Sequence, residues 1–390
     1  MKKAVYGGLA AVLCLALGAC GSASGDNDEK AFKIGGCGPL SGNNAVYGEA
    51  VKNGAQIAVD EVNAEGEVRL DFRYEDDQAD TEAAVNAYNT LADWGMQASI
   101  GATTSGSGQA ISSLYAKDHI FAITPSGSSL GVIYRDAQNA KDPYGNVFQM
   151  CFTDPNQGVA SADYLSSHPE LGTKIAIIYR NDDNYSSGVY ATFMQEAESK
   201  NLDIVYEGTF TKDTTDFSVQ VQQAQAAGAD IVFLPIYYQP ASLILQTAKS
   251  LAYTPTFFGC DGMDGILTQE NFDTSLAEGL YMLTPFSADA QDEATRRFVQ
   301  TYKEKYGEVP NQFAADAYDA IHALAQALRD AKVSADDDAG VINEALIQQF
   351  TTMTFQGITG TGDITWNADG EVSKGPRAVV IKDGVYVNAE

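Results

Sequence analysis

The sequence predicts an α/β protein built from two doubly wound lobes. Three observations predict this class: strand-like apolar runs alternate with stretches of helical periodicity, the alternation occurs twice, and Gly or Asn stands at helix exits. One run, 174–180 (KIAIIYR), is apolar almost throughout, as is typical of a parallel strand covered on both faces. A length of 390 residues also favours two domains.

The first series begins at residue 32. Its expected strands cover 32–38, 68–76, 98–102 and 120–125, and its expected helices cover 47–64, 80–94 and 107–118. Gly66 and Gly95 follow two of these helices, where a left-handed residue usually ends a helix. Residues 133–145 are predicted to form a polar loop before the apolar run at 147–152.

The second series follows the same pattern. Its expected strands cover 174–180, 202–208, 230–236 and 254–259, and its expected helices cover 185–200, 216–227 and 239–252. The last third then changes: a strand at 279–286 precedes helices at 291–306, 311–331 and 339–350, and short strands with Asp-Gly turns are expected within 362–372 and 378–387. This helical block between strands suggests that the chain recrosses between the lobes.

The composition excludes two kinds of partner. Lys and Arg number 24 against 52 Asp and Glu, giving a formal charge of −28, while 45% hydrophobic residues supply ample core. Such acidity argues against binding nucleic acid, because few basic groups are available to displace counterions from phosphates. It also argues against docking on an anionic membrane through the protein's own surface.

The N-terminus predicts an address signal. Lys2 and Lys3 precede a short apolar run, residues 8–19, that ends in Leu-Gly-Ala before Cys20. This ending resembles a bacterial lipobox, which implies a lipoprotein signal peptide over 1–19 and lipidation of Cys20; the alternative is an ordinary signal peptide. Residues 20–30 would then be a flexible tether holding the protein outside the cytoplasm, anchored to the bacterial cell membrane.

Cysteine and histidine patterns give no sign of a metal. Cys37, Cys151 and Cys260 remain beyond the signal, each in or beside an apolar run, as suits small buried side chains. One disulfide is possible, and the sequence does not choose the pair. Neither a CxxC motif nor a His/Cys ligand spacing occurs, so we expect no metal and no cofactor.

The loops after the predicted strands favour a zwitterionic ligand. In open α/β sheets, ligands bind at the carboxyl ends of the strands. In the first series these loops carry hydroxyls, at 103–105 and 126–129, beside helix N-termini that suit a carboxylate. In the second series they carry tyrosines and Asp261, which suit a ligand body and an ammonium group. Together these features predict an α-amino acid site.

Enzyme patterns receive little support. Residues 127–131 fit G-x-S-x-G, but none of His119, His168 and His322 is placed in the sequence as that motif would need. No phosphate-binding G-x-x-x-x-G-K-[ST] loop is present, and the glycines of the first strand miss G-x-G-x-x-G by one position. We therefore expect a protein that is not an enzyme and has no catalytic residues.

Several motifs, in order, carry a family resemblance. They are GPLSGNNAVYGEAVKNGAQIAVDEVNAEG, YEDDQAD, SIGATTSGSGQAI, AITPSGSS, FTDPNQG and NYSSG. The chain resembles type I periplasmic-type solute-binding proteins of the Leu/Ile/Val-binding, branched-chain amino acid family of ABC transporters. The resemblance implies two Rossmann-like lobes joined by a three-stranded hinge. Lobe 1 would comprise 31–151 plus 286–355, and lobe 2 would comprise 152–285 plus 356–390.

The resemblance also implies the site residues. Carboxylate contacts fall on Ser105, Ser126 and Ser128, and the ammonium partner falls on Asp261, where branched-chain binders usually carry Glu. The aromatic lining falls on Tyr47, Tyr185 and Tyr238, with Tyr237 expected to pack. Thr104, in the loop before Ser105, is a further expected ligand contact.

The expected function is capture of an amino acid by closure of the two lobes, as a monomer, and its delivery to an ABC permease. Two alternatives stay open. One is a lipoprotein sensor that signals through a receptor. The other is transport of an aromatic or aliphatic acid that lacks an amine.

Overall fold

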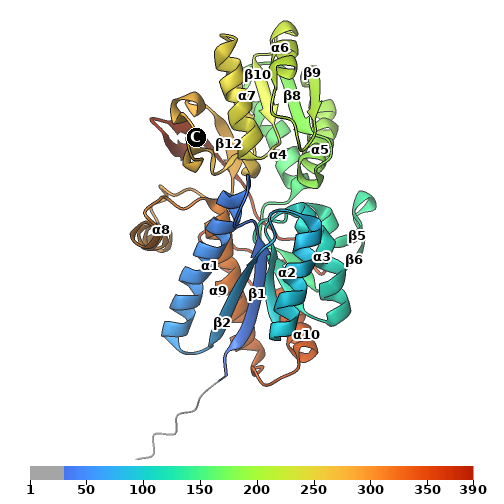
Figure 1. The fold of residues 1–390 in the computed structure, drawn as a ribbon, viewed down its shortest axis with the longest axis vertical. Coiled ribbons are helices and arrows are strands. Elements are labelled where there is room, and N and C mark those ends of the chain that lie inside the picture. The colour runs from blue at the N-terminus through green and yellow to red at the C-terminus, as the bar shows by residue number, and fades with distance from the viewer. Residues whose placement is uncertain (1–29, 390) are drawn as a thin grey trace, which may run out of the picture.

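The protein, seen in a computed structural model, forms two α/β lobes stacked end to end (Figure 1). The structure describes residues 30–389. The expected signal peptide, Cys20 and all of the expected tether except Lys30 lie outside the described residues. Within the described part, no helix is long and apolar enough to cross a membrane.

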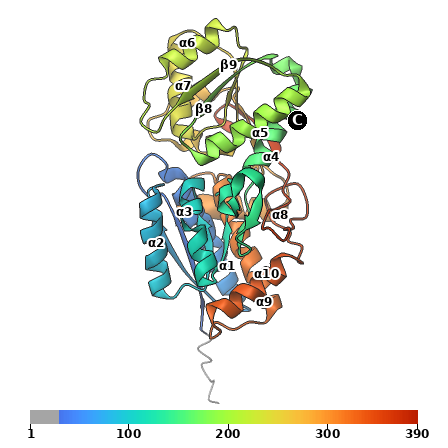
Figure 2. The ribbon, with the colours of Figure 1, turned by 90° about the vertical axis from the view of Figure 1, so that its right-hand side faces the viewer.

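The first lobe is built on a five-stranded parallel sheet in the order β2-β1-β3-β4-β7. The strands are β1 (Phe32–Gly38), β2 (Leu70–Asp76), β3 (Ala98–Ala102), β4 (Phe121–Thr124) and β7 (Val147–Gln149). Helices α2 (Thr81–Trp94) and α3 (Ser105–Asp118) cover one face, and α1 (Ala45–Glu65), α9 (Gln312–Ala331) and α10 (Ala339–Phe350) cover the other (Figure 2).

The second lobe is built on a seven-stranded sheet in the order β14-β13-β12-β11-β10-β8-β9. The strands are β8 (Lys174–Arg180), β9 (Asp203–Phe210), β10 (Ile231–Leu234), β11 (Thr256–Gly259), β12 (Tyr281–Thr284), β13 (Arg377–Lys382) and β14 (Val385–Asn388). Strand β13 pairs antiparallel with both β12 and β14. Helices α4 (Asp154–Ser167) and α5 (Asn184–Lys200) cover one face, and α6 (Ser218–Ala226) and α7 (Tyr238–Ser250) cover the other. Helix α8 (Glu293–Tyr306) lies beside α1.

Local chemistry explains the boundaries of these elements. The Asp80 carboxylate accepts the backbone N–H groups of Glu82 and Ala83, both at 3.0 Å, and so caps α2. Gly95 ends the same helix at φ +87°, a conformation that glycine adopts without steric cost. Ile175 to Ile178 of β8 are all buried, as the continuous apolar run predicted. The doubly wound fold is therefore confirmed in both lobes.

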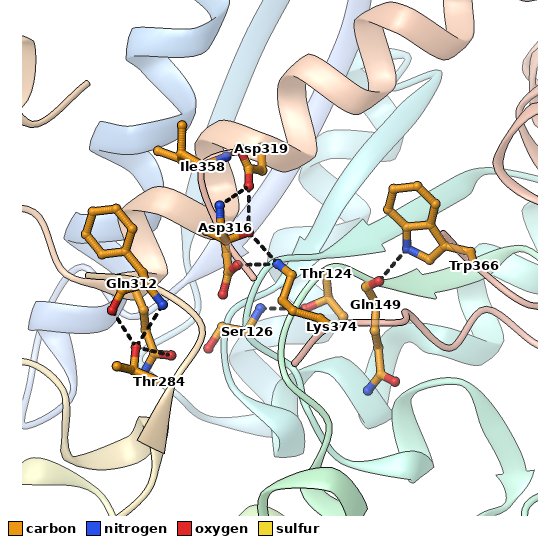
Figure 3. Close-up of polar contacts among 12 residues, drawn as sticks. Thr124, Ser126, Gln149, Thr284, Gln312, Asp316, Asp319, Ile358, Trp366 and Lys374 are labelled. Carbon is orange, nitrogen blue, oxygen red and sulfur yellow. Dashed lines mark hydrogen bonds and ion pairs between the residues drawn. The ribbon is translucent and has the colours of Figure 1, made fainter. Parts of the chain in front are cut away.

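Three connections join the sheets: β7 to α4, β12 to α8 and α9, and α10 to β13. A buried ion pair ties the third connection to α9, where Lys374 Nζ lies 2.7 Å from the Asp316 carboxylate (Figure 3). Lys374 also donates to Thr359 Oγ1 at 2.6 Å. Asp319, one turn further along α9, accepts the N–H groups of Ile358 and Thr359, both at 3.0 Å.

Three segments differ from the expectations. Helix α4 was given no predicted bounds, because its buried face is made mainly of small residues (Gly158, Ser161 and Ala162) that give a weak hydrophobic signal. The expected loop at 133–145 contains a small hairpin, β5 (Tyr134–Asp136) and β6 (Lys141–Pro143). Residues 362–372 form no strand and make isolated bridges, Phe355 to Ile364 and Trp366 to Val372.

Short 3₁₀ turns lie at Leu130–Val132, Ala137–Asn139, Pro169–Leu171, Asp261–Met263, Ile266–Thr268 and Thr274–Ala277.

The exact division of the chain between the lobes stays a prediction. Trp366 donates its indole N–H to the carbonyl of Gln149 at 2.7 Å, and its ring lies 4.8 Å from that of Phe350. Both partners belong to the first lobe. These contacts favour moving the last boundary from residue 356 to a point beyond Trp366.

Candidate ligand-binding site

A small pocket lies between the two lobes, where the carboxyl ends of both sheets face each other. The position is the one expected for ligands of open α/β sheets. The lining side chains come from both lobes. They are Tyr47, Thr103, Thr104, Ser105, Ser126, Ser128, Tyr185, Tyr237, Asp261, Gly262 and Phe313.

The first lobe supplies hydroxyls and the N-terminus of α3. Thr104 occupies the N-cap position of α3, yet its hydroxyl makes no capping bond. That oxygen is buried and has no hydrogen-bond partner among the described residues. Ser105 begins the helix, and Ser126 and Ser128 lie in the loop after β4. Free N–H groups and the helix dipole make this corner favourable for an anion.

The second lobe supplies Asp261, at the end of β11. Burial, and to a lesser extent the negative charge of Asp316, raise the pKa of the Asp261 carboxyl to about 7. The nearby Tyr185 hydroxyl and Gln157 side chain oppose this rise in pKa without cancelling it. No cation among the described residues pairs with the Asp261 carboxylate. The carboxyl is therefore costly to ionise until a positive group arrives.

A second buried carboxyl, which sequence reasoning missed, stands beside the pocket. Asp154 is only 2% exposed, and burial raises its pKa well above the ordinary value, with the charge of Asp261 adding to the effect. Neither of its carboxylate oxygens has a hydrogen-bond partner in the described structure, although the Ser128 hydroxyl lies near enough to lower the pKa. Asp154 begins α4, and its N–H donates to the carbonyl of Ser128 at 3.0 Å. The FTDPNQG motif contains it, but nothing in the sequence places it near Asp261.

Four aromatic rings line the pocket. The ring of Tyr47 lies 4.7 Å from that of Phe313 and 5.5 Å from that of Tyr237, in edge-on contacts. Tyr237 in turn stacks on Tyr185, at 5.3 Å and 4° between planes. These rings present an apolar surface for the body of a ligand.

The structure brings together most of the predicted site residues. Seven of the eight line the pocket: Tyr47, Thr104, Ser105, Ser126, Ser128, Tyr185 and Asp261. Tyr238, predicted to touch the ligand, is not among the lining residues; its hydroxyl donates to the carbonyl of Asn43 at 2.6 Å. Its neighbour Tyr237, predicted to pack, lines the pocket instead. Contact of the predicted site residues with a ligand stays a prediction.

Four lining residues were absent from the predicted site. Thr103, Tyr237 and Gly262 adjoin predicted residues, so chain neighbourhood alone could have included them. Phe313 could not be found that way, because it comes from the start of α9, more than fifty residues beyond Asp261. Only the return of the chain to the first lobe brings it to the pocket.

No metal or disulfide chemistry is present in the described part of the chain. No group of three or more His, Cys, Asp or Glu side chains is placed there to hold a metal. Cys37, Cys151 and Cys260 are free and buried, and burial raises the pKa of each thiol. These thiols are therefore unreactive at neutral pH.

Two facing α/β lobes with a polar and aromatic pocket between them define a two-lobed binding protein. Comparison with known families agrees, because a family model described as "Periplasmic binding protein" matches residues 31–384. The chain belongs to the type I periplasmic binding protein family, in its branched-chain amino acid branch. Members of this family bind solutes and are not enzymes.

Individual relatives resemble the chain over nearly its whole length. "Leu/Ile/Val-binding protein homolog 1" of Brucella abortus (strain 2308) is 26% identical and covers 99% of both chains. The branched-chain amino acid transporter substrate binding protein LivJ of Streptococcus pneumoniae, solved with isoleucine, is 27% identical with a TM-score of 0.79, covering 92% of this chain and 98% of the other. A solute binding protein of R. palustris, solved with benzoate, has the same TM-score at 19% identity, covering 92% and 96%; it shares the fold.

Proposed function

We propose that this protein captures an α-amino acid between its lobes and delivers it to the permease of an ABC importer. One observation carries the proposal: two buried carboxyls without a cation, Asp154 and Asp261, stand near an anion-favouring helix N-terminus that carries an unpartnered hydroxyl. A zwitterion is the ligand that satisfies both ends of such a pocket.

In this proposal each part of the pocket binds one part of the ligand. The ligand carboxylate accepts from the start of α3 and from the hydroxyls of Thr104, Ser105, Ser126 and Ser128. The ammonium group pairs with Asp261 and lies close to Asp154. The side chain packs among the rings of Tyr47, Tyr185, Tyr237 and Phe313. The names of relatives, Leu/Ile/Val-binding protein and an isoleucine complex among them, support an apolar side chain.

An acid without an amine is the competing ligand class, because one structural neighbour was solved with benzoate. Such a ligand would fill the carboxylate end and leave Asp154 and Asp261 buried without a cation. An unpaired buried carboxylate costs free energy unless it is protonated. This cost favours an amino acid. Lipidation of Cys20, placing the protein on the outer side of the cell membrane, is part of the same proposal.

Calorimetry of the purified protein tests the ligand class. Titration with each of the 20 common amino acids and with benzoate should give binding to at least one amino acid and none to benzoate. Asp261→Asn should weaken amino acid binding about tenfold to a hundredfold, because a charge-assisted hydrogen bond contributes about 1.5–3 kcal/mol. The matched control is Asp203→Asn, at an exposed position of the same lobe. Benzoate binding without amino acid binding, or an unchanged Asp261→Asn affinity, would contradict the proposal.

A further inference from the structure

The geometry points to Gln312 as a positioning residue. It docks the Asp261 turn, residues 261–264 of the second lobe, onto the first lobe, and so couples the contact between the lobes to ligand binding. We infer that its contacts favour the closed form and so raise ligand affinity, although Gln312 is not among the residues that line the pocket. This inference rests on the proposed function, since Asp261 is there the partner of the ligand's ammonium group.

Gln312 makes three hydrogen bonds, each to a different residue. Its side-chain Nε2 donates to the carbonyl oxygen of Asp261 at 3.0 Å, and its backbone N–H donates to Asp264 Oδ2 at 2.8 Å. Its Oε1 accepts from the Thr284 hydroxyl at 3.3 Å, at the end of β12 (Figure 3). Gln312 is 1% exposed, so these bonds are shielded from water.

The partners of Gln312 belong to the other lobe. Gln312 is the first residue of α9, which packs along α1 in the first lobe. The Asp261 turn follows β11 in the second sheet. One residue of the first lobe therefore holds both ends of the turn that presents Asp261 to the pocket.

The contact with Asp264 is more than a helix cap. Helix α9 already has its own N-cap, because Asn311 Oδ1 accepts the N–H of Ala314 at 3.2 Å. The Asp264 carboxylate, 4% exposed, satisfies a further N–H from across the lobe boundary, near the positive end of the helix dipole. By accepting the N–H of Gln312, the Asp264 carboxylate therefore helps to dock the second lobe against the first.

Ligand binding and docking share the same short segments. The carbonyl of Asp261 accepts from Asp264 N–H at 2.8 Å as well as from Gln312, so the turn is fixed from within and from the first lobe. The residue after Gln312, Phe313, lines the pocket. A ligand that touches Asp261 and Phe313 thus bridges the two sides that Gln312 already joins. Removing the Gln312 amide loosens this junction without deleting an atom that touches the ligand.

Gln312→Met tests the inference because it keeps the length of the side chain and removes its hydrogen bonds. We expect the Kd for the bound amino acid to rise about tenfold, since two neutral hydrogen bonds across the junction are lost. The ligand-free variant should also show a larger radius of gyration by small-angle X-ray scattering than ligand-free wild type, because the open form is more populated. Asn311→Ala is the matched control: it should lower Tm through loss of the cap and leave Kd within twofold.

Distinct results would overturn the inference. If Gln312→Met binds within twofold of wild type, or loses affinity only as much as Asn311→Ala, Gln312 has a structural role alone. Should Gln312→Met fail to fold, Asp264→Ala, which removes the acceptor of the Gln312 N–H, decides by the same two readouts and the same expectations. Absence of amino acid binding to wild type would refute the proposed function itself, and an unchanged radius of gyration would refute the coupling independently of any ligand.

Discussion

At the scale of single residues, some polar atoms at the pocket already form hydrogen bonds within the protein, and others remain available to a ligand. The Tyr47 hydroxyl donates to the carbonyl of Gly262 and accepts the N–H of Tyr238 at 3.1 Å. The Tyr185 hydroxyl donates to Gln157 Oε1 at 3.2 Å and accepts the N–H of Gly262 at 3.0 Å. Both phenols therefore contribute mainly their rings. The hydroxyl of Thr104, which lines the pocket, has no such partner among the described residues; the same holds for the oxygens of Asp154, which lies outside the lining.

Binding should depend on pH through Asp261. An ammonium ligand pairs with the ionised carboxylate, whose pKa in the free protein is about 7. As the pH falls from 8 to 5, Asp261 takes up a proton that the ligand must displace. Affinity should therefore fall by up to about tenfold per pH unit below 7. Calorimetry in buffers of different ionisation enthalpy measures both the affinity and the proton released.

The variant Asp261→Asn gives the control for this pH dependence. It should bind weakly at every pH, with a nearly flat profile between pH 5 and 8. A steep profile that survives the substitution would assign the titration to Asp154, whose pKa is also raised. An affinity that rises as the pH falls would contradict pairing of the ammonium group with either carboxylate.

Lining residues could be predicted from the sequence where the residue type and its position in a loop both favour contact with a ligand. Serines and threonines before a helix, and an aspartate at a strand end, were placed in the pocket. Neighbouring residues of one type were harder to assign: Tyr238 was expected to touch the ligand and Tyr237 to pack, whereas Tyr237 lines the pocket. Which of the two rings faces the pocket depends on the start of α7. Asp154 was missed because its significance comes from its burial and its proximity to Asp261.

At the scale of elements, α9 joins the site to the connections between lobes. Gln312, Asp316 and Asp319 recur at helical spacing, and each contacts a segment outside the first-lobe sheet. The Asp316–Lys374 pair is buried, with side chains 2% and 0% exposed. Loss of Lys374 would leave two carboxyls, Asp316 and Asp319, in the interior with no cation.

We expect Lys374→Met to lower the free energy of unfolding by about 3–5 kcal/mol, because removing one partner of a buried pair leaves an uncompensated charge. Urea denaturation at pH 7.5 measures this change. Arg329→Met is the matched control: Arg329 lies on α9, as Asp316 does, but pairs with Glu67 on an exposed surface. The control should cost at most about 1 kcal/mol. Equal effects of the two substitutions would show that the buried pair contributes no special stability.

Element prediction depended on the strength of the hydrophobic pattern. The parallel strands were predicted well, because their apolar runs are covered on both faces. Helix α4 was given no predicted bounds and the hairpin at β5 and β6 was not predicted, because small or polar residues form them. Residues 362–372 alternate like a strand, yet Trp366 and Gly370 pack against the edge of the first sheet with only isolated pairing. Such tertiary contacts carry no local signal.

At the scale of the whole molecule, several buried carboxyls set the dependence of stability on pH. The folded-state pKa is raised to about 7 for Asp261 and to about 6 for Asp77, Asp264 and Asp316, whereas an unfolded aspartate titrates near 4. Between about pH 4 and 7 the folded protein therefore binds more protons than the unfolded chain. Its stability falls as the pH rises through this window.

Thermal unfolding of the ligand-free protein should give a higher Tm at pH 5.5 than at pH 8. The net charge of −28 acts in the same direction, since repulsion weakens as carboxylates are protonated. Saturating amino acid should reduce the difference, because the ligand compensates Asp261 at high pH. A Tm that rises from pH 5.5 to pH 8 without ligand would contradict these pKa directions.

The two buried carboxyls without a cation, Asp154 and Asp261, have one more consequence, which concerns the ligand-free protein. In the proposed function, closing an empty pocket would keep Asp154 and Asp261 buried with no cation among the described residues to neutralise them, and this costs free energy. The ammonium group of the proposed ligand would then be the counter-ion that makes closure favourable. A permease that accepts only the closed shape would thereby distinguish a loaded protein from an empty one, and futile docking would be suppressed by the chemistry of two aspartates.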